Sequence, residues 1–435
     1  MKNIFEEFKK RGIIGQYTEN ISNLFDTKIN VYLGTDPTAD SLHVGHLAPI
    51  ITLKRLQNHG CKPYLLIGGA TGMIGDPSFK NAERVFLDSE IIKKNVEGLK
   101  KQVARFLDFD KNNSNCAEVV DNADWYSKMN VIDFLRDAGK NITVNYMSAK
   151  ESVKKRIISG MSFTEFSYQI LQAYDFYYLH NKYDINLQIG GDDQWGNITS
   201  GADFIRKKIS QEVHAFTIKL ITKEDGTKFG KTESGTVWLD SAKTSPYEFY
   251  QFWINRTDEE VVKYIKIFSL KNIKEIEELI KLHNNNPENR FLQKELAKEM
   301  TIFVHGKEEY ENIRNSSESI FGNCNFEDLL KIEDIESFLK NINNKIVQKK
   351  EVILCKTYYD LLSQIAIPDL FKSKSEIKRS FEEKSIYINK NKIGNEDLNV
   401  DKDIFKNNFI IIQKGGKKYF VVFFKIAYEK ETVIL

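Results

Sequence analysis

Residues 29–56, INVYLGTDPTADSLHVGHLAPIITLKRL, decide how this chain begins to fold. Positions 29–33 are rich in strand-forming residues, 34–41 in turn formers, and 44–56 carry apolar residues at helical spacing. The stretch predicts a strand, a loop and a helix in that order. Such a helix N-terminus offers free N–H groups and a partial positive charge to a phosphate, and the two imidazoles of HVGH add further donors beside it.

A second short motif, KFGKT at residues 228–232, lies far downstream. Lys228 and Lys231 flank a glycine in a polar stretch, which is typical of a mobile loop that closes over a polyphosphate. Alone, a pair such as His43 and His46 is more often structural, and a Lys-Phe-Gly-Lys run is more often a solvated turn. Together, and in this order, the motifs resemble the two signatures of class I aminoacyl-tRNA synthetases. They predict activation of a substrate by ATP.

Strand and helix patterns alternate from residue 29 to residue 221. The expected strands cover residues 29–33, 63–67, 117–120, 185–189 and 216–221, and helical patterns between them include 89–107, 163–179 and 194–208. This alternation predicts an α/β fold with a Rossmann-like, doubly wound parallel sheet covered by helices on both faces. Ligands of such sheets bind beyond the carboxyl ends of the strands, where segments 32–46, 68–76 and 190–194 are expected.

The rest of the chain changes character twice. We expect a Rossmann-like catalytic domain at 1–221, followed by a KFGKT loop and linker at 222–245 and a small all-α domain at 246–315. A connector that starts the C-terminal domain is expected at 316–368, and a basic α+β RNA-binding module at 369–435.

Composition limits the class of protein. The chain has 435 residues, of which 41% are hydrophobic, and a formal net charge of only +2, so any surface for nucleic acid must be local. Four widely spaced cysteines predict reduced thiols and no zinc site. No apolar run long enough for a membrane span and no N-terminal targeting pattern are recognised, which predicts a cytoplasmic protein without a membrane partner.

The C-terminal 67 residues hold the clearest local basic charge. Residues 369–435 contain 14 lysines and arginines against 10 acidic residues. The order of a basic helix and short strands resembles an RNA-binding module first described in a small-subunit ribosomal protein, although a solvated charged face would look similar by charge alone. The expected RNA contacts are Lys372, Lys374, Lys378 and Arg379.

One predicted helix, 163–179, carries a polar face. Tyr168, Gln172 and Asp175 have the i, i+4, i+7 spacing that places a phenol, an amide and a carboxylate on one side of a helix. Without context, an ordinary ion pair or an exposed face explains this pattern equally well. Buried among aromatic residues, however, the carboxylate needs a donor.

The context favours a ligand pocket. The helix sequence SFTEFSYQILQAYD at 162–175, with QIGGDDQWGN at 188–197 and GGATGMIGDP at 68–77, resembles the bacterial tyrosyl-tRNA synthetases, and the resemblance runs through nearly the whole chain. Leu33 and Pro49 depart from the common family pattern in the ATP-binding region. The motifs are long and therefore specific.

The resemblance implies a role for each matching residue. The substrate's phenol would contact Tyr32 and Asp175, and its ammonium group would contact Asp76, Tyr168 and Gln172. Its carboxylate and the α-phosphate would lie near Gln194, and Asn122 would lie behind the residues that contact the nucleotide. The implied ATP-binding residues are Asp36, Thr38, His43, His46, Gly191, Asp193, Lys228 and Lys231. Of these, Thr38, His43, His46, Lys228 and Lys231 would serve catalysis, and Lys80 and Arg84 would form a second cationic arm.

The same resemblance implies the reaction and the partners. L-tyrosine would be activated by ATP with Mg²⁺ as the accompanying ion, without a tightly bound cofactor or protein metal site, and then transferred to tRNA(Tyr) by a homodimer. A tryptophan-specific relative, a small-molecule nucleotidyltransferase and an inactive RNA-binding protein are the alternatives. Tyr32 with Asp175, the basic tail and the retained histidines and lysines argue against these three in turn.

Overall fold

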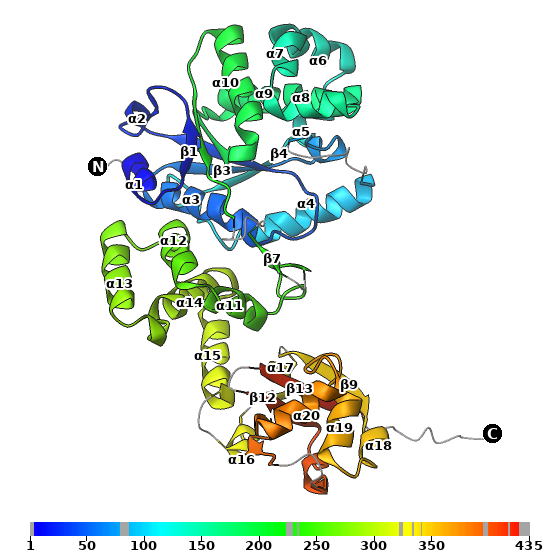
Figure 1. The fold of residues 1–435 in the computed structure, drawn as a ribbon. Helices are drawn as coiled ribbons and strands as arrows, with labels where there is room; N and C mark the ends of the chain where they lie inside the picture. Colours follow the sequence, from blue (N-terminus) through cyan, green and yellow to red (C-terminus); the bar gives the residue numbers. More distant parts are fainter. Residues whose placement is uncertain are drawn as a thin grey trace, which may run out of the picture. The chain divides into compact units, whose positions relative to one another are not determined.

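The computed structural model describes residues 4–78, 87–222, 229–232, 235–321, 325–332, 335–340, 342–394, 399–415 and 418–425. Of residues 152, 155, 231–232, 316–321 and 337 it describes the backbone alone. The chain forms two compact units (Figure 1). The first combines Met1–Thr244 with Phe249–Val304, and the second combines Ser245–Glu248 with His305–Leu435.

A six-stranded sheet forms the centre of the first unit. Its strand order is β1-β6-β5-β2-β3-β4, in which β1 is an antiparallel edge and the other neighbours are parallel. The strands are β1 (Ile14–Tyr17), β2 (Asn30–Thr35), β3 (Lys62–Ile67), β4 (Glu118–Asp121), β5 (Leu187–Gly191) and β6 (His214–Ile218). Five expected strands are confirmed with ends shifted by at most three residues, whereas β1 was not predicted.

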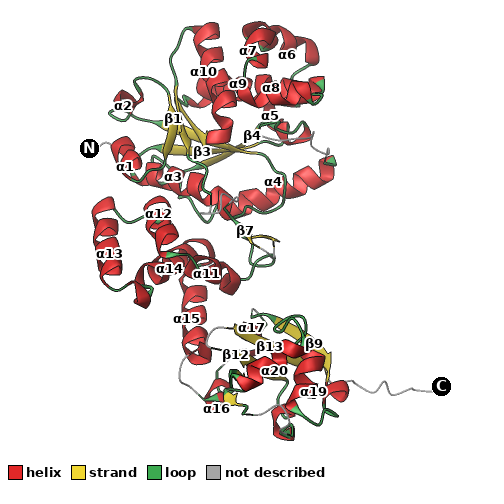
Figure 2. Ribbon diagram, viewed as in Figure 1, coloured by secondary structure: helices red, strands yellow, loops and turns green. Residues whose placement is uncertain are grey.

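Helices cover both faces of this sheet (Figure 2). One layer contains α1 (Ile4–Lys10), α2 (Ile21–Leu24), α3 (Leu47–Asn58) and α4 (Ser89–Val103), and the other α9 (Phe163–Tyr183) and α10 (Trp195–Ile209). Neighbouring strand residues face opposite layers: Leu33 packs in the cluster with α3, and Tyr32 in the cluster with α9. The predicted doubly wound α/β fold is therefore confirmed.

Short helices precede α9 in the chain. They are α5 (Ala123–Tyr126), α6 (Val131–Asp137), α7 (Val144–Ser148) and α8 (Glu151–Ile158), with the 3₁₀ turn η3 (Gly139–Asn141) between α6 and α7. The sequence reading did not predict them, because they are short and several of their apolar residues are exposed.

Strand order reverses at β2. The chain passes from β2 to β3 on one side of the sheet and returns through β5 on the other, so the carboxyl ends of β2 and β5 flank a topological switch point. Three 3₁₀ turns follow the strand ends at η1 (Val44–His46), η2 (Thr71–Met73) and η4 (Asp192–Gln194). The predicted helix at 44–56 thus begins as a 3₁₀ turn and becomes α3 at Leu47.

The region from residue 246 is helical, as expected. It contains α11 (Pro246–Ile254), α12 (Asp258–Phe268), α13 (Ile273–Asn285), η5 (Pro287–Asn289), α14 (Phe291–His305) and α15 (Lys307–Phe321). Before it, β7 (Lys231–Thr232) and β8 (Gly235–Thr236) form a small hairpin. Arg11 and Arg55 of the sheet domain both bind the end of α12.

The second unit contains a five-stranded sheet of order β11-β10-β12-β13-β9. Its strands are β9 (Asn344–Gln348), β10 (Ile386–Ile388), β11 (Asn391–Lys392), β12 (Phe409–Lys414) and β13 (Lys418–Lys425). Its helical turns are α16 (Phe326–Leu329), α17 (Ile335–Leu339), α18 (Lys349–Val352), α19 (Tyr358–Ile365), α20 (Lys374–Glu382) and η6 (Lys402–Phe405). The α+β class is confirmed, but β9, which pairs in parallel with β13, lies in a stretch predicted as connector and helices.

Candidate active site

The HVGH segment begins at the switch point and shapes its own turn. His43 caps η1, where its Nδ1 accepts the Gly45 N–H at 3.0 Å, and His46 Nδ1 accepts the His43 N–H at 3.2 Å. The two rings lie 4.0 Å apart. Burial, and then the neighbouring His43, lower the pKa of His46 to about 3. Because each Nδ1 accepts from the backbone, the neutral form of each ring carries its proton on Nε2.

The KFGKT motif meets this turn through its glycine. Gly230 has φ +87°, and a Cβ built there would lie 2.6 Å from Val44 Cγ2. The Val237 N–H donates to Gly230 O and the Val44 N–H to Val237 O, both at 3.0 Å, so the returning chain ties the two motifs together. The predicted proximity of the motifs is thus observed at backbone level. Lys228, Lys80 and Arg84 lie outside the described residues, and of Lys231 only the backbone is described.

Asp175 occupies the polar face of α9 and is 1% exposed. Its Oδ2 accepts Asn122 Nδ2–H and its Oδ1 accepts Trp125 Nε1–H, each at 3.0 Å. Burial raises the pKa of Asp175 to about 7, although hydrogen bonding by Asn122, Tyr126 and Trp125 favours the ionised form. The two oxygens of a carboxylate offer about four acceptor sites, so acceptor capacity remains for a ligand.

Unpartnered polar atoms belong to α9 and to the strands β2 and β5 beneath it. Among the described residues, Tyr32 Oη, Gln172 Oε1 and Gln188 Oε1 are buried and have no hydrogen-bond partner. Tyr32 and Gln188 are register neighbours on β2 and β5, and Tyr32 stays protonated because burial and the Asp175 charge raise its pKa. A buried hydroxyl without a partner is costly, so the Tyr32 hydroxyl near the Asp175 charge indicates a place for a polar ligand.

Asp76 and Gln194 meet at the far side of the same strand ends. Gln194 Nε2 donates to Asp76 Oδ2 at 2.6 Å, and the Ser78 N–H donates to Asp76 Oδ1 at 2.9 Å. Asn197 joins them through longer contacts to Asp76 and Gln194. This group provides a carboxylate and an amide suited to an ammonium group and a carboxylate of a ligand.

Hydrogen bonds connect the parts of the site. Tyr168 Oη donates to Asp36 Oδ2 and Thr71 Oγ1 to Asp36 Oδ1, both at 2.8 Å, while Asn122 Nδ2 donates to Thr71 Oγ1 at 3.0 Å and also to Asp175. A Cβ on Gly68 would lie 2.1 Å from Asp36 Oδ1, so only glycine permits this approach. The loop that follows β2 is therefore linked to the Asp175 pocket.

The remaining predicted residues lie on the neighbouring loops. Thr38 is exposed and its N–H donates to Asp36 O at 2.8 Å. Gly191 ends β5, and Asp193 follows in η4 with its Oδ1 only 2.4 Å from a Cβ built on Gly191. Their places fit a nucleotide beside the switch point.

Sequence reasoning missed Trp125, Thr71 and Gln188 as parts of the site. Thr71 and Trp125 follow the carboxyl ends of β3 and β4, whereas Gln188 lies inside β5. Both Thr71 and Gln188 stand within the quoted motifs, which could have marked them. Trp125 carries no such signal, because an ADW tripeptide after a short strand is usually core packing.

The four predicted RNA contacts belong to the second unit. Lys374, Lys378 and Arg379 lie on α20 and Lys372 just before it, and all four are exposed. Lys378 Nζ lies 5.4 Å from the centre of the Tyr359 ring. These four side chains form a basic surface at α20.

Residues 25–322 match the model of the class I tRNA synthetases for W and Y, and residues 334–422 match a C-terminal domain of tyrosine–tRNA ligases. The tyrosine–tRNA ligase of Amoebophilus asiaticus is 45% identical over 97% of this chain and 99% of that protein, and that of Cytophaga hutchinsonii 45% identical over 98% and 100%.

A solved structure agrees with the sequence comparisons. The truncated mitochondrial tyrosyl-tRNA synthetase of Aspergillus nidulans superposes with a TM-score of 0.66 at 29% identity, covering 74% of this chain and 94% of that one. None of the helices that the structure describes is long and apolar enough to cross a membrane. The chain belongs to the class I tRNA synthetases for tryptophan and tyrosine, and within them to the tyrosine–tRNA ligases.

Proposed function

We propose that this chain activates L-tyrosine with ATP and then transfers the tyrosyl group to the 3′ end of tRNA(Tyr). The observation that carries this is the pocket in which the orphaned Tyr32 hydroxyl accompanies the buried Asp175 carboxylate. A phenol can donate to the carboxylate and accept from Tyr32, whereas an indole N–H can only donate. The names of the relatives point to the same substrate.

Substrate positioning would fall to the groups around that pocket. Asp76, Tyr168 and Gln172 would bind the ammonium group of tyrosine, and Gln194 would lie near its carboxylate. The carboxylate is ionised at neutral pH and attacks the α-phosphorus of ATP in line, so no general base is needed. Holding both reactants in this geometry replaces a costly encounter by a reaction within one complex.

Charge on the departing pyrophosphate would be met by donors and cations. His43 and His46 would present their Nε2–H groups, and the exposed Thr38 lies at the same loop. Lys228 and Lys231 would follow as the KFGKT loop closes, and Asp36, Gly191 and Asp193 would hold the rest of the nucleotide. These groups act where negative charge develops, which is the most effective place for electrostatic catalysis. We propose Mg²⁺ as part of the substrate MgATP, bound through its phosphates.

The second step would use the C-terminal unit. The terminal ribose hydroxyl of tRNA attacks the adenylate carbonyl, and the basic surface at Lys372, Lys374, Lys378 and Arg379 would hold the RNA backbone. We place this activity in the cytoplasm.

A homodimer is proposed from an apolar surface on α6 to α9. Val131, Ile132, Val144, Ile158 and Phe163 are exposed, with Phe163 at 76% and Ile158 at 88%. Apolar side chains clustered in this way mark an interaction surface. Phe163→Asp is expected to yield monomers in light scattering, whereas Leu282→Asp, at an exposed residue of α13, is the control and should leave the dimer intact.

Tyrosine-dependent exchange of pyrophosphate into ATP tests the proposed reaction. The assay compares tyrosine, phenylalanine and tryptophan with wild type, Tyr32→Phe and Asp175→Ala. Tyr17→Phe, at a half-exposed tyrosine of β1, is the matched control. We expect exchange with tyrosine alone, reduced in Tyr32→Phe and lost in Asp175→Ala. Preference for tryptophan would assign the sister specificity, and no exchange from folded protein would refute the proposal.

Rejection of phenylalanine follows from the same pocket. Phenylalanine leaves the Tyr32 hydroxyl and the Asp175 carboxylate without their partner. For tyrosine-specific synthetases as a class, this discrimination is known to reach about 10⁵, a figure of the class and not of this pocket.

A further inference from the structure

Two buried arginines hold the C-terminal end of α12. Arg55 Nη2 donates to Ile267 O at 2.7 Å and also to Ser269 O. Arg11 Nη1 donates to Lys266 O at 2.9 Å and to Ser269 O at 3.2 Å. Both guanidinium groups come from the sheet domain, Arg55 from α3 and Arg11 from the turn after α1. Cations satisfy the free carbonyls of a helix end and its partial negative charge.

Burial of the Arg55 guanidinium group costs free energy. Arg55 is 5% exposed, and among the described residues its Nε and Nη1 have no partner. Burial, and then the neighbouring Arg11, lower the pKa of Arg55. Apolar side chains of similar size would join two helices at less cost. Packing alone therefore does not explain why an arginine is buried against α12.

The helix α12 carries the anchor of the KFGKT loop. Phe229 is buried against it, with its ring 5.1 Å from the ring of Tyr264 and 5.4 Å from that of Phe268. From α11, Phe252 and Trp253 complete the aromatic cluster. Phe229 immediately follows Lys228 and precedes Gly230, which touches the HVGH turn. The position of α12 thus sets where the motif is held.

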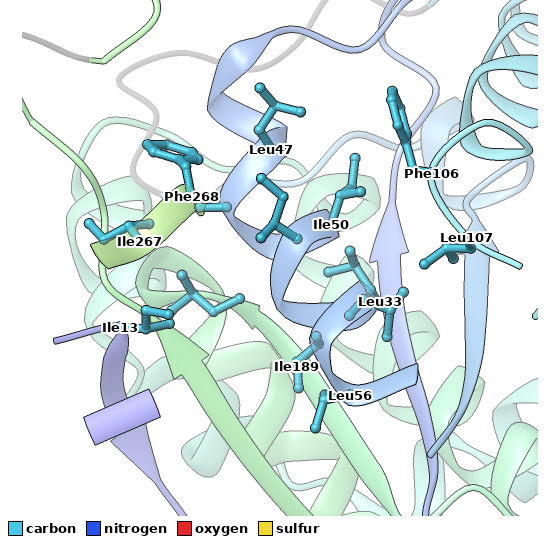
Figure 3. Packing of buried hydrophobic residues seen from close by; sticks show 14 of the residues in the cluster. Ile13, Leu33, Leu47, Ile50, Leu56, Phe106, Leu107, Ile189, Ile267 and Phe268 are labelled. Carbon is cyan, nitrogen blue, oxygen red and sulfur yellow. The ribbon is translucent and has the colours of Figure 1, made fainter. Parts of the chain in front are cut away.

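The other end of the connection is α3. Its first residue follows His46, and near its last turn Arg55 binds α12. Figure 3 shows Ile267 and Phe268 of α12 near the end of α3 that carries Leu47, and they belong to the same core cluster as Leu47, Ile50 and Leu56. The helix α3 therefore connects the HVGH turn to α12, against which Phe229 packs.

We infer that Arg55, supported by Arg11, is a positioning residue for tyrosyl-adenylate formation. It fixes α12, against which Phe229 of the KFGKT motif packs, relative to the HVGH turn. The inference rests on the proposed function. Arg55 touches no substrate and acts through α12 and Phe229. Its loss shifts Phe229 and Gly230 relative to the HVGH turn while leaving the tyrosine pocket intact.

Single-turnover kinetics with full-length enzyme test this inference. The rate of adenylate formation and the tyrosine Kd are measured for Arg55→Met, Arg55→Lys and Phe229→Leu. Arg105→Met, the same exchange at an exposed arginine after α4, is the control. We expect Arg55→Met to slow adenylate formation about tenfold to 100-fold, the usual effect of a small misplacement, with tyrosine Kd changed less than about twofold. Arg55→Lys should be intermediate and Arg105→Met unchanged.

A double-mutant cycle decides whether Arg55 acts through Phe229. If it does, Arg55→Met combined with Phe229→Leu slows the reaction hardly more than the worse single variant. If the factors by which the two single variants slow the reaction multiply in the double variant, the inference is overturned. So would an Arg55→Met enzyme with a lowered melting temperature but a normal rate, since that is the result for packing alone.

Hydrogen exchange gives a readout that does not depend on activity. Peptides covering Phe229 and Val237 should exchange faster in Arg55→Met, and in Arg55→Lys if the former does not fold, than in Arg105→Met. Faster exchange in a protein without tyrosine-dependent activity would refute the proposed function but retain the coupling. Unchanged exchange with an active wild type would refute the coupling alone.

Discussion

The buried Asp175 carboxylate makes tyrosine binding depend on pH near neutrality. Its pKa in the free protein is raised to about 7 by burial. When it is ionised, the phenol of tyrosine donates to it. When it is protonated, its new proton must face Asn122 or Trp125, which are donors themselves, or the phenol, which then loses its charged acceptor. Affinity is therefore expected to fall as pH drops through about 7.

The magnitude follows from the protonated fraction. At pH 6, about ten of every eleven molecules carry the proton, so the tyrosine Kd should rise about tenfold from its value at pH 8. The rise should level off at about tenfold to 100-fold, the value of a hydrogen bond to a charged group. His46 does not contribute, because its pKa of about 3 keeps the ring neutral throughout.

Equilibrium dialysis of radiolabelled tyrosine from pH 5.5 to 8.5 measures this effect, with Asp175→Asn as the control. The variant should bind weakly at every pH. A wild-type Kd that stays within twofold over this range would refute the reasoning.

The same pKa affects folding with the opposite sign. Because the folded value lies above the usual 3.8, the folded state binds more protons than the unfolded state between these values. This group's contribution to stability should decline by about 4 kcal/mol as pH rises from about 4 to 7, and stay constant above. The free energy of unfolding is measured by thermal melts at several pH values, and the difference between wild type and Asp175→Asn isolates this dependence.

Three further changes give distinct results. Trp125→Phe removes one N–H donor from the buried carboxylate, so tyrosine Kd at pH 8 should rise about tenfold and its pH midpoint should move upward, as dialysis will show. Gly68→Ala forces a Cβ against Asp36, and adenylate formation should fall at least about tenfold in stopped-flow assays of folded protein. Glu165→Ala breaks a buried ion pair and should cost about 3–5 kcal/mol, seen as a lower melting temperature, whereas Glu90→Ala at an exposed pair should change little.

Local sequence determined five strands of the first sheet, the two motifs and the helix that carries Tyr168, Gln172 and Asp175. It indicated a parallel sheet but not the order of its strands, which depends on long-range pairing. The edge strand β1 and the parallel strand β9 were missed. Each is short, and each is stabilised by a partner distant in the sequence, β6 and β13 respectively.

Tertiary structure alone decided how the site is held together. The spacing of Asp175 on its helix predicts a shared polar face, but not that Trp125 and Asn122 would be its donors, since they come from another strand end. Nor did any pattern indicate that Arg55 would bind the end of α12, 212 positions away. The sequence determined which groups each element offers through local periodicity and turn chemistry. Burial, pKa shifts and long-range hydrogen bonds depend on which elements pack against each other, and only the tertiary structure decided that.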